Sequence, residues 1–195
     1  MTIQEFPHQH TAHCESGVMS TLLKYHGHNL DEAMIFGIAH ALTFVWMPLI
    51  KLNGMPLVSY RTAPRSIIKN TCKALGLKLS VRKFSDAQSG QAALDAALSS
   101  GKLAGLQTSV FWLPYFPPQM RFHFNAHNLL VYGKDGNDYL ISDPVFETVQ
   151  RCAAEDLQRA RFAKGVLAAK GMMYTLEANR PSEKIMVDLP AIIRK

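Results

Sequence analysis

Two apolar runs that flank one Asp-Gly turn constrain the fold of this chain more than any other segment. They lie within residues 123–144, and the turn is Asp135-Gly136. Apolar runs on both sides of Asp-Gly predict a β-hairpin. A three-residue loop, Lys134-Asp135-Gly136 with its glycine left-handed, sets His127 opposite Asp143, whereas a two-residue loop turns Asp143 to the other face. A functional pair of these two side chains therefore requires the three-residue loop.

A cysteine lies where an irregular N-terminus is expected to become the first helix, in His13-Cys14-Glu15-Ser16-Gly17. Apolar positions then recur at helical spacing as far as Tyr25, and Gly27 suits the end of the helix. The positive end of the helix dipole and the unpaired N–H groups there favour a thiolate. Cys14 is therefore a candidate nucleophile, which would need His127 and Asp143 as proton donor and orienting group. The alternative is a core cysteine.

Composition predicts one domain of ordinary size, because 195 residues with 48% hydrophobic content can bury a core. We place it at residues 1–180, with 181–195 as a tail or the start of a helical extension. No signal peptide and no apolar stretch of membrane-spanning length are recognised, so we expect a soluble, cytoplasmic protein without a membrane span. The cysteines are widely spaced, which favours neither a disulfide framework nor a zinc site and suits a reducing compartment.

The remaining pattern predicts alternating helices and strands. Asn29-Leu30-Asp31-Glu32 reads as an N-terminal cap. Residues 42–50 read as an edge strand or an extended connection, followed by turn residues at 53–56. The other expected elements are helices from 31 to about 41, from 64 to 76, over 88–100 and over 155–162, and strands over 77–83, 102–110 and 171–176.

Basic residues are concentrated in one segment of a chain whose net charge is +6, because residues 61–83 carry seven basic side chains and no acidic one. Arg61, Arg65, Lys69 and Lys73 recur every four residues, so those on a helix form one cationic stripe. The stripe is either a solvated face or a docking site for an acidic partner. The histidine-rich tract before Cys14 lacks regular ligand spacing, so we expect no metal, and we expect neither a cofactor nor a nucleic-acid partner.

Residues 111–122 contain three prolines and five aromatic residues, which forbid a regular element. Such a loop either forms one wall of an apolar substrate cleft or fills the core. Trp112 and Tyr115 in this loop are candidate substrate-binding residues. Asn125 and Asn128 lie beside His127 in the sequence, and they either position substrate or satisfy backbone groups.

Four segments, in order, resemble the N-terminal domain of butirosin-biosynthesis protein H, a member of the papain-like cysteine peptidase superfamily. The order of nucleophile, histidine and Asp-Pro is also similar to that of the leader peptidases of bacteriocin exporters. The matching segments are His13-Cys14-Glu15-Ser16-Gly17, Asp31-Glu32-Ala33-Met34-Ile35-Phe36-Gly37-Ile38, Lys51-Leu52-Asn53-Gly54-Met55-Pro56-Leu57, and Ala126-His127-Asn128 with Asp143-Pro144.

The resemblance implies a papain-like α+β fold, in which an N-terminal helix that bears Cys14 packs on an antiparallel β-sheet. It implies an acyltransferase of secondary-metabolite biosynthesis, which moves an acyl group from an acyl carrier protein or coenzyme A thioester to a small-molecule amine or hydroxyl. Cys14 would form the acyl-enzyme, His127 would be the general base and acid, and Asp143 would orient His127.

This sequence departs from the family pattern at the oxyanion donor. Papain-like enzymes place a glutamine six residues before the cysteine, whereas here His8 holds that position and Gln9 follows one residue late. Both are oxyanion candidates. Longer family members continue into a helical second domain, and residues 189–195 look like a helix just beginning. This segment either docks on a partner chain, as in a homo-oligomer, or leads into a longer protein.

Two other functions fit the same residues. The first is hydrolysis by a peptidase or thioesterase, with water as the acceptor. The second is a non-catalytic binding module that keeps the fold, in which His127 would point away from Cys14. Transfer and hydrolysis differ in whether water is excluded from the acyl-enzyme.

Overall fold

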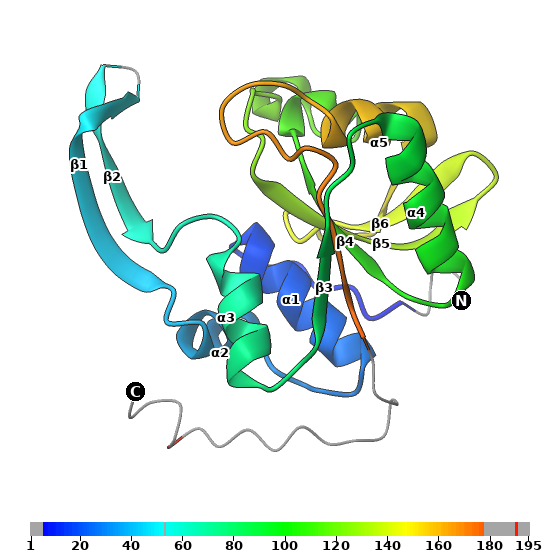
Figure 1. The fold of residues 1–195 in the computed structure, drawn as a ribbon, viewed down its shortest axis with the longest axis horizontal. Coiled ribbons are helices and arrows are strands. Elements are labelled where there is room, and N and C mark those ends of the chain that lie inside the picture. Colours follow the sequence, from blue (N-terminus) through cyan, green and yellow to red (C-terminus); the bar gives the residue numbers. More distant parts are fainter. Residues whose placement is uncertain (1–5, 53, 178–189, 191–195) are drawn as a thin grey trace.

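The strands fall into two separate sheets in the computed structural model, which describes residues 6–52, 54–177 and 190. One sheet is a hairpin of β1 (Leu42–Leu52) and β2 (Met55–Arg61). The other has six antiparallel strands in the order β3-β8-β4-β5-β6-β7. Figure 1 shows the hairpin extending away from the rest of the molecule, at the left of the view. The strands of the larger sheet are β3 (Leu79–Arg82), β4 (Ala104–Thr108), β5 (His127–Asp135), β6 (Asp138–Ser142), β7 (Gln150–Ala153) and β8 (Met173–Leu176).

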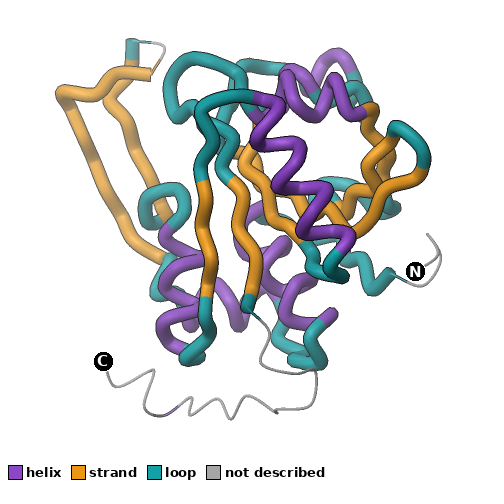
Figure 2. The backbone as a smooth tube through the Cα atoms, turned by 45° about the vertical axis from the view of Figure 1, so that its right-hand side comes forward, coloured by secondary structure: helices purple, strands orange, loops and turns teal. Residues whose placement is uncertain are grey.

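Helices pack against both faces of the larger sheet (Figures 1 and 2). One core contains α1 (Cys14–Tyr25), α2 (Glu32–Ile38) and α3 (Ser66–Ala74), and the other contains α4 (Ala87–Ser99) and α5 (Ala154–Arg161). Strand β5 contributes to both cores because its side chains alternate between the two faces. Leu130 packs in the core of α1, and Leu129 packs in the core of α5. Helix α1 is thereby fixed against the strand that begins at His127.

Most of the predicted elements are present, with shifted ends. Helix α1 spans Cys14–Tyr25, and Gly27 follows it with a φ of 85°. Helix α2 ends at Ile38, before the predicted residue 41, because His40 adopts a left-handed φ of 49°. Helix α3 begins at Ser66 and not at Pro64, because Arg65 adopts a φ of 75°. These interruptions come from left-handed backbone at non-glycine residues, which sequence rarely reveals.

The sequence prediction misses strands β2 and β7. Gly54 and Pro56 are typical of a turn, yet Pro56 pairs with Lys51 in the hairpin. Proline is tolerated there because the strand has only one neighbour in its sheet. Pro48 lies between Met47 and Lys51, where the pairing of β1 is irregular. The edge-strand alternative predicted for residues 42–50 is confirmed, because these residues form β1, whose one neighbour in its sheet is β2.

The predicted domain boundary near residue 180 and the helix expected at 189–195 lie outside the described residues, with the exception of Pro190. The domain limits stay a prediction. In the part of the chain that the structure describes, none of the helices has the length and apolar character needed to cross a membrane.

Candidate active site

Cys14 is the first residue of α1, and its surroundings fix the start of that helix. His13 is the N-cap, and its Nδ1 accepts a hydrogen bond from the backbone N–H of Ser16 at 3.4 Å. The Glu32 carboxylate accepts hydrogen bonds from the backbone N–H groups of Ala12, at 2.9 Å, and His13, at 2.6 Å. Helix α2 therefore holds the chain that leads into Cys14, which keeps the thiol at the positive end of the α1 dipole.

His127 and Asp143 form a buried pair, 3% and 0% exposed, with 2.7 Å between Nε2 and Oδ2. Burial lowers the pKa of the imidazole, but the charge and hydrogen bond of Asp143, with those of Cys14, outweigh burial and raise that pKa to about 10. The raised pKa favours the protonated form of His127. Because Nε2 contacts Asp143, the ring nitrogen that remains for Cys14 is Nδ1.

The pKa of the Cys14 thiol is shifted in the opposite direction, downward. Burial raises the pKa of this thiol, but the hydrogen bond and charge of His127 and a hydrogen bond from the Asn128 backbone lower it by more. The pKa therefore lies below the ordinary thiol value. A lowered pKa on a half-buried thiol beside a protonated imidazole is the environment of a reactive cysteine. The geometry thus favours a thiolate–imidazolium pair.

The pairing register of β5 and β6, which sets the position of His127 relative to Asp143, differs from the predicted register. Asp135 pairs with Asp138, so the loop has two residues and the predicted three-residue loop is wrong. Tyr132 is an extra residue in β5, because the strand advances from 131 to 133 while β6 advances by a single residue. This β-bulge shifts the register by one position and returns His127 and Asp143 to the same face as diagonal neighbours.

Tyr115, a predicted substrate-binding residue, instead contacts the carboxylate of Asp143. Its hydroxyl donates to Oδ2 at 2.8 Å, and the backbone N–H of Val145 donates to Oδ1 at 3.1 Å. Burial and the Asp143 charge raise the pKa of the phenol well above its ordinary value, so Tyr115 keeps its proton and remains a donor. Asp143 is therefore held by three hydrogen-bond partners.

A cleft of about 800 Å³ opens beside Cys14 and His127, both of which line it. The inner face of the β1–β2 hairpin forms one side, and the aromatic loop forms another. Its apolar lining includes Val45, Met47, Leu57, Val110, Phe116, Met120, Phe122, Phe124, Val145 and Leu167. The aromatic loop therefore forms one wall of an apolar cleft, which was one of the two predicted alternatives. The loop residues that line the cleft differ from the ones predicted from the sequence.

The other predicted substrate residues do not line this cleft. Trp112 is partly exposed and packs against Phe111. The Asn125 amide donates to the carbonyl of Val166 at 2.8 Å, and Asn128 donates to the carbonyl of Ala126 at 3.2 Å. The two asparagines thus satisfy backbone groups, which was the alternative interpretation.

The two oxyanion candidates form hydrogen bonds with other parts of the protein and do not line the cleft beside Cys14. The His8 ring lies 2.7 Å from Ser142 Oγ and donates to the carbonyl of Phe146 at 2.9 Å. Gln9 Oε1 accepts from Ser20 Oγ at 3.1 Å. Within the described ranges, no group of three or more His, Cys, Asp or Glu side chains is placed to hold a metal ion.

The cationic stripe is divided. Lys69 and Lys73 lie exposed on α3, whereas Arg61 and Arg65 precede that helix. Arg61 Nη2 donates to the buried carboxylate of Glu15 at 2.7 Å, and Arg65 Nε donates to Gln107 at 2.6 Å. Two of the four basic residues therefore serve internal contacts.

Glu15 is a residue that the sequence analysis missed. It is 0% exposed, and besides Arg61 it accepts hydrogen bonds from the backbone N–H groups of Arg65, at 3.1 Å, and Ile68, at 3.2 Å. It thus joins the helix of Cys14 to the base of the hairpin and to α3. Its partners lie far away in the sequence, so no local signal could have identified it.

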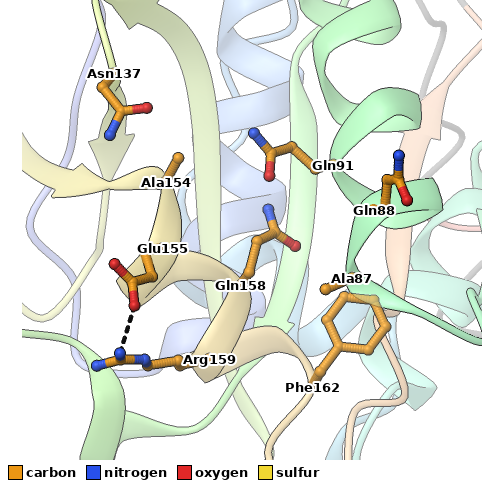
Figure 3. A pocket seen from close by; sticks show the side chains of 9 residues that line it. All are labelled: Ala87, Gln88, Gln91, Asn137, Ala154, Glu155, Gln158, Arg159 and Phe162. Carbon is orange, nitrogen blue, oxygen red and sulfur yellow. Dashed lines mark hydrogen bonds and ion pairs between the residues drawn. The ribbon is translucent and has the colours of Figure 1, made fainter.

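A second hollow of about 620 Å³ lies between α4 and α5 (Figure 3). Its charged residues, Glu155 and Arg159, pair with each other, and Gln88, Gln91, Asn137 and Gln158 supply amides. Among the described residues that line it there is neither a nucleophile nor a histidine. Of these two cavities, the cleft of Cys14 is therefore the one that contains a thiol and histidines.

Solved structures that share this fold include two with peptidase names. A candidate C39-like peptidase from Bacillus anthracis is 12% identical at a TM-score of 0.63, and the match covers 91% of this chain and 97% of that one. The peptidase domain of Streptococcus ComA, a bifunctional ABC transporter involved in quorum sensing, is 15% identical at a TM-score of 0.53, covering 88% and 98%. No curated protein sequence matches significantly. At these identities the likeness shows the fold alone, and it confirms the predicted papain-like α+β class.

The family is shown by the sequence. The profile of the family described as butirosin biosynthesis protein H, N-terminal, matches residues 13–144, which is more than half of the 195 residues. The matched range includes Cys14, His127 and Asp143. The predicted resemblance is confirmed, and the chain belongs to the butirosin biosynthesis protein H N-terminal family.

Proposed function

We propose that this protein is an acyltransferase that moves an acyl group from a carrier-protein or coenzyme A thioester to an amine or hydroxyl acceptor through Cys14. The observation that carries the proposal is the meeting of Cys14, His127 and Asp143 at an apolar cleft. Membership of a family named for butirosin biosynthesis favours a role in secondary metabolism. The fold, with its lowered thiol pKa, supports covalent acyl chemistry in general.

The reaction has two steps. The Cys14 thiolate attacks the thioester carbonyl, a new C–S bond forms, and the bond to the carrier sulfur breaks. His127 gives its proton to the departing thiolate. The acceptor amine or hydroxyl then attacks the acyl-enzyme and gives a proton to His127, while the bond to Cys14 breaks. The N-terminus of α1 supplies backbone N–H groups for the oxyanion of each step.

An acidic carrier protein is the proposed donor partner. The net charge of +6 favours such a partner, and Lys69 and Lys73 are the members of the predicted stripe that remain exposed. Lys69→Glu with Lys73→Glu should slow acylation by a carrier-protein thioester and leave acylation by a small thioester unchanged. Equal effects on both donors would argue against docking at α3.

Hydrolysis is the second candidate function, because both structural relatives carry the name of a peptidase. The same thiolate and imidazolium would act, with water as the acceptor. What separates the two functions is the lifetime of the acyl-enzyme in water. The apolar lining of the cleft supports transfer, because it limits the access of water to the acyl-enzyme.

Intact mass spectrometry tests these alternatives. The full chain is incubated with acyl carrier protein thioesters, and then with an amine. A Cys14 adduct that is stable in water and released by the amine supports transfer, whereas rapid release of free acid supports hydrolysis. Cys14→Ala must lose the adduct, and Cys72→Ala, which alters a buried cysteine in the core of α3, must keep it. No adduct, with an iodoacetamide rate equal to that of a free thiol, would favour a binding module.

A further inference from the structure

The cleft beside Cys14 has two apolar walls from distant parts of the chain. Val45, Met47 and Leu57 face it from the β1–β2 hairpin, and Phe116 and Phe122 face it from the aromatic loop. In the hairpin, Met47 pairs directly with Leu57, so their side chains share one face. A group bound to Cys14 therefore lies between two hydrophobic surfaces.

Most of the opposite face of the hairpin is directed away from the cleft, although Val58, which pairs with Trp46 on that face, borders it. Phe44, Trp46 and Tyr60 alternate in sequence with the lining residues and are 66%, 58% and 68% exposed. The hairpin thus offers inner and outer apolar residues on the same strands. This arrangement provides matched control positions for the inner wall.

The charged groups of the cleft have partners within the protein. Arg61 Nη2 donates to Glu15 at 2.7 Å, its Nε donates to the carbonyl of Thr62 at 2.8 Å, and its Nη1 contacts the His13 ring. Burial and the Arg61 charge lower the pKa of His13, so that ring is neutral. His127 is paired with Asp143 and Cys14. An acyl group with a carboxylate would therefore enter an apolar cleft without a counter-ion, which is costly.

We infer that the acyl group taken up by Cys14 is an uncharged aliphatic chain, held between the inner face of the hairpin and the aromatic loop. This inference rests on the proposed acyl transfer and names its substrate class. A cavity of about 800 Å³ is within the range of pockets that bury most of a small ligand. The scissile carbonyl lies at Cys14, so the chain beyond it occupies the apolar cleft.

The test compares N-acetylcysteamine thioesters that differ only in the acyl group. Each methylene that enters the cleft should increase the rate of Cys14 acylation about two- to fourfold, so octanoyl, with six methylenes more than acetyl, should react roughly sixtyfold to several thousandfold faster. Butyryl and succinyl provide a pair of equal carbon number. The succinyl carboxylate should slow acylation at least about tenfold relative to butyryl. Rates are followed by intact mass.

Two substitutions on β2 locate the binding surface. Leu57→Asp places a charge on the inner face and should reduce the octanoyl rate roughly tenfold or more, which lowers the octanoyl-to-acetyl ratio. Tyr60→Asp, three residues along the same strand, places the charge on the outer face and should leave the ratio unchanged. Circular dichroism and the iodoacetamide rate of Cys14 verify that both variants fold.

Each result is decisive. Equal acetyl and octanoyl rates, a faster reaction with succinyl, or an equal loss of ratio in both variants would overturn the aliphatic substrate while acyl transfer stands. If no thioester acylates Cys14, although iodoacetamide does, the proposed function fails and the inference fails with it.

Discussion

Tyr115 donates a hydrogen bond of 2.8 Å to the Oδ2 atom of Asp143, the same oxygen that lies 2.7 Å from His127 Nε2. The aromatic loop therefore does more than line the cleft. Through Tyr115 it positions the carboxylate that contacts the imidazole. A buried phenol with a raised pKa remains a donor across the physiological range.

Removing this hydroxyl should destabilise the protein. Tyr115→Phe leaves a buried carboxylate short of one donor, so we expect the free energy of unfolding to fall by about 1.5–3 kcal/mol, measured by urea denaturation. Acylation of Cys14 should also slow, because Asp143 is less firmly held. Tyr60→Phe, on the exposed face of the hairpin, is the control and should change stability by less than about 0.5 kcal/mol. Equal stability of the two variants would contradict the role of Tyr115.

The thiol should depend on His127 for its reactivity. In the wild-type protein we expect iodoacetamide to alkylate Cys14 at a pH below the ordinary thiol pKa. In His127→Ala the largest remaining influence is burial, which raises the pKa, so the midpoint of the pH–rate profile should move above the ordinary value. Peptide mapping checks selectivity, because burial raises the pKa of Cys72 and Cys152 to about 12. An unchanged midpoint in His127→Ala would show that the imidazole does not act on the thiol.

Stability should depend on pH through the same histidine. Folding raises the pKa of His127 from 6.5 to about 10. A pKa raised by folding stabilises the folded state fully below the unfolded value, and this stabilisation is lost as the pH rises through the folded value. The thiol titrates together with this imidazole, so the comparison is made without it: the difference in unfolding free energy between Cys14→Ala and Cys14→Ala with His127→Ala should be largest near about pH 6 and shrink toward about pH 10. Urea denaturation across this range measures it, and a difference that grows with pH would contradict the assignment.

The resemblance to a known family was sufficient for the fold class, and local patterns alone marked Cys14 and His127 as candidate site residues. A cysteine at a helix start and a histidine at the head of an apolar strand are both visible without coordinates. The register between His127 and Asp143 was not, since it depends on a bulge at Tyr132 rather than on the loop. A bulge has no reliable local signature, and here it reversed the parity that the two-residue loop alone would impose.

Long-range contacts explain the other differences. Arg61 and Arg65 read as surface charges because their partners, Glu15 and Gln107, lie more than forty residues away. The inner and outer faces of the hairpin were also indistinguishable, since Val45 and Met47 alternate with Phe44 and Trp46 and all four are apolar. Periodicity identifies a strand, but only packing decides which face lines the cleft.

The ion pair of Arg61 and Glu15 should contribute to stability. Arg61→Met leaves the buried Glu15 carboxylate without its cation, and we expect a loss of about 2–4 kcal/mol in the free energy of unfolding, measured by urea denaturation. Arg159→Met breaks an exposed pair with Glu155 and should cost less than about 1 kcal/mol. Similar losses in the two variants would indicate that Glu15 does not depend on Arg61.

The close approach of α1 to the residues that follow β6 depends on Gly17. A Cβ at this position would lie 1.9 Å from Thr11 Oγ1 and 2.8 Å from Pro144 Cβ, so one of these segments must move. Pro144 follows Asp143 directly, and Gly17 lies one turn after Cys14. Gly17→Ala should therefore displace the thiol relative to the imidazole as well as strain the core.

We expect Gly17→Ala to reduce the free energy of unfolding by about 1–3 kcal/mol, as overpacking does. The iodoacetamide rate of Cys14 at neutral pH should fall as well, because a displaced thiol loses the hydrogen bond that lowers its pKa. Gly37→Ala is the matched control, since a Cβ there meets nothing within 4 Å and alanine favours the helix by about 0.5–1 kcal/mol. If Gly17→Ala kept both the stability and the thiol reactivity of the wild type, the close contact of Gly17 with Pro144 would not be what positions helix α1 beside Asp143.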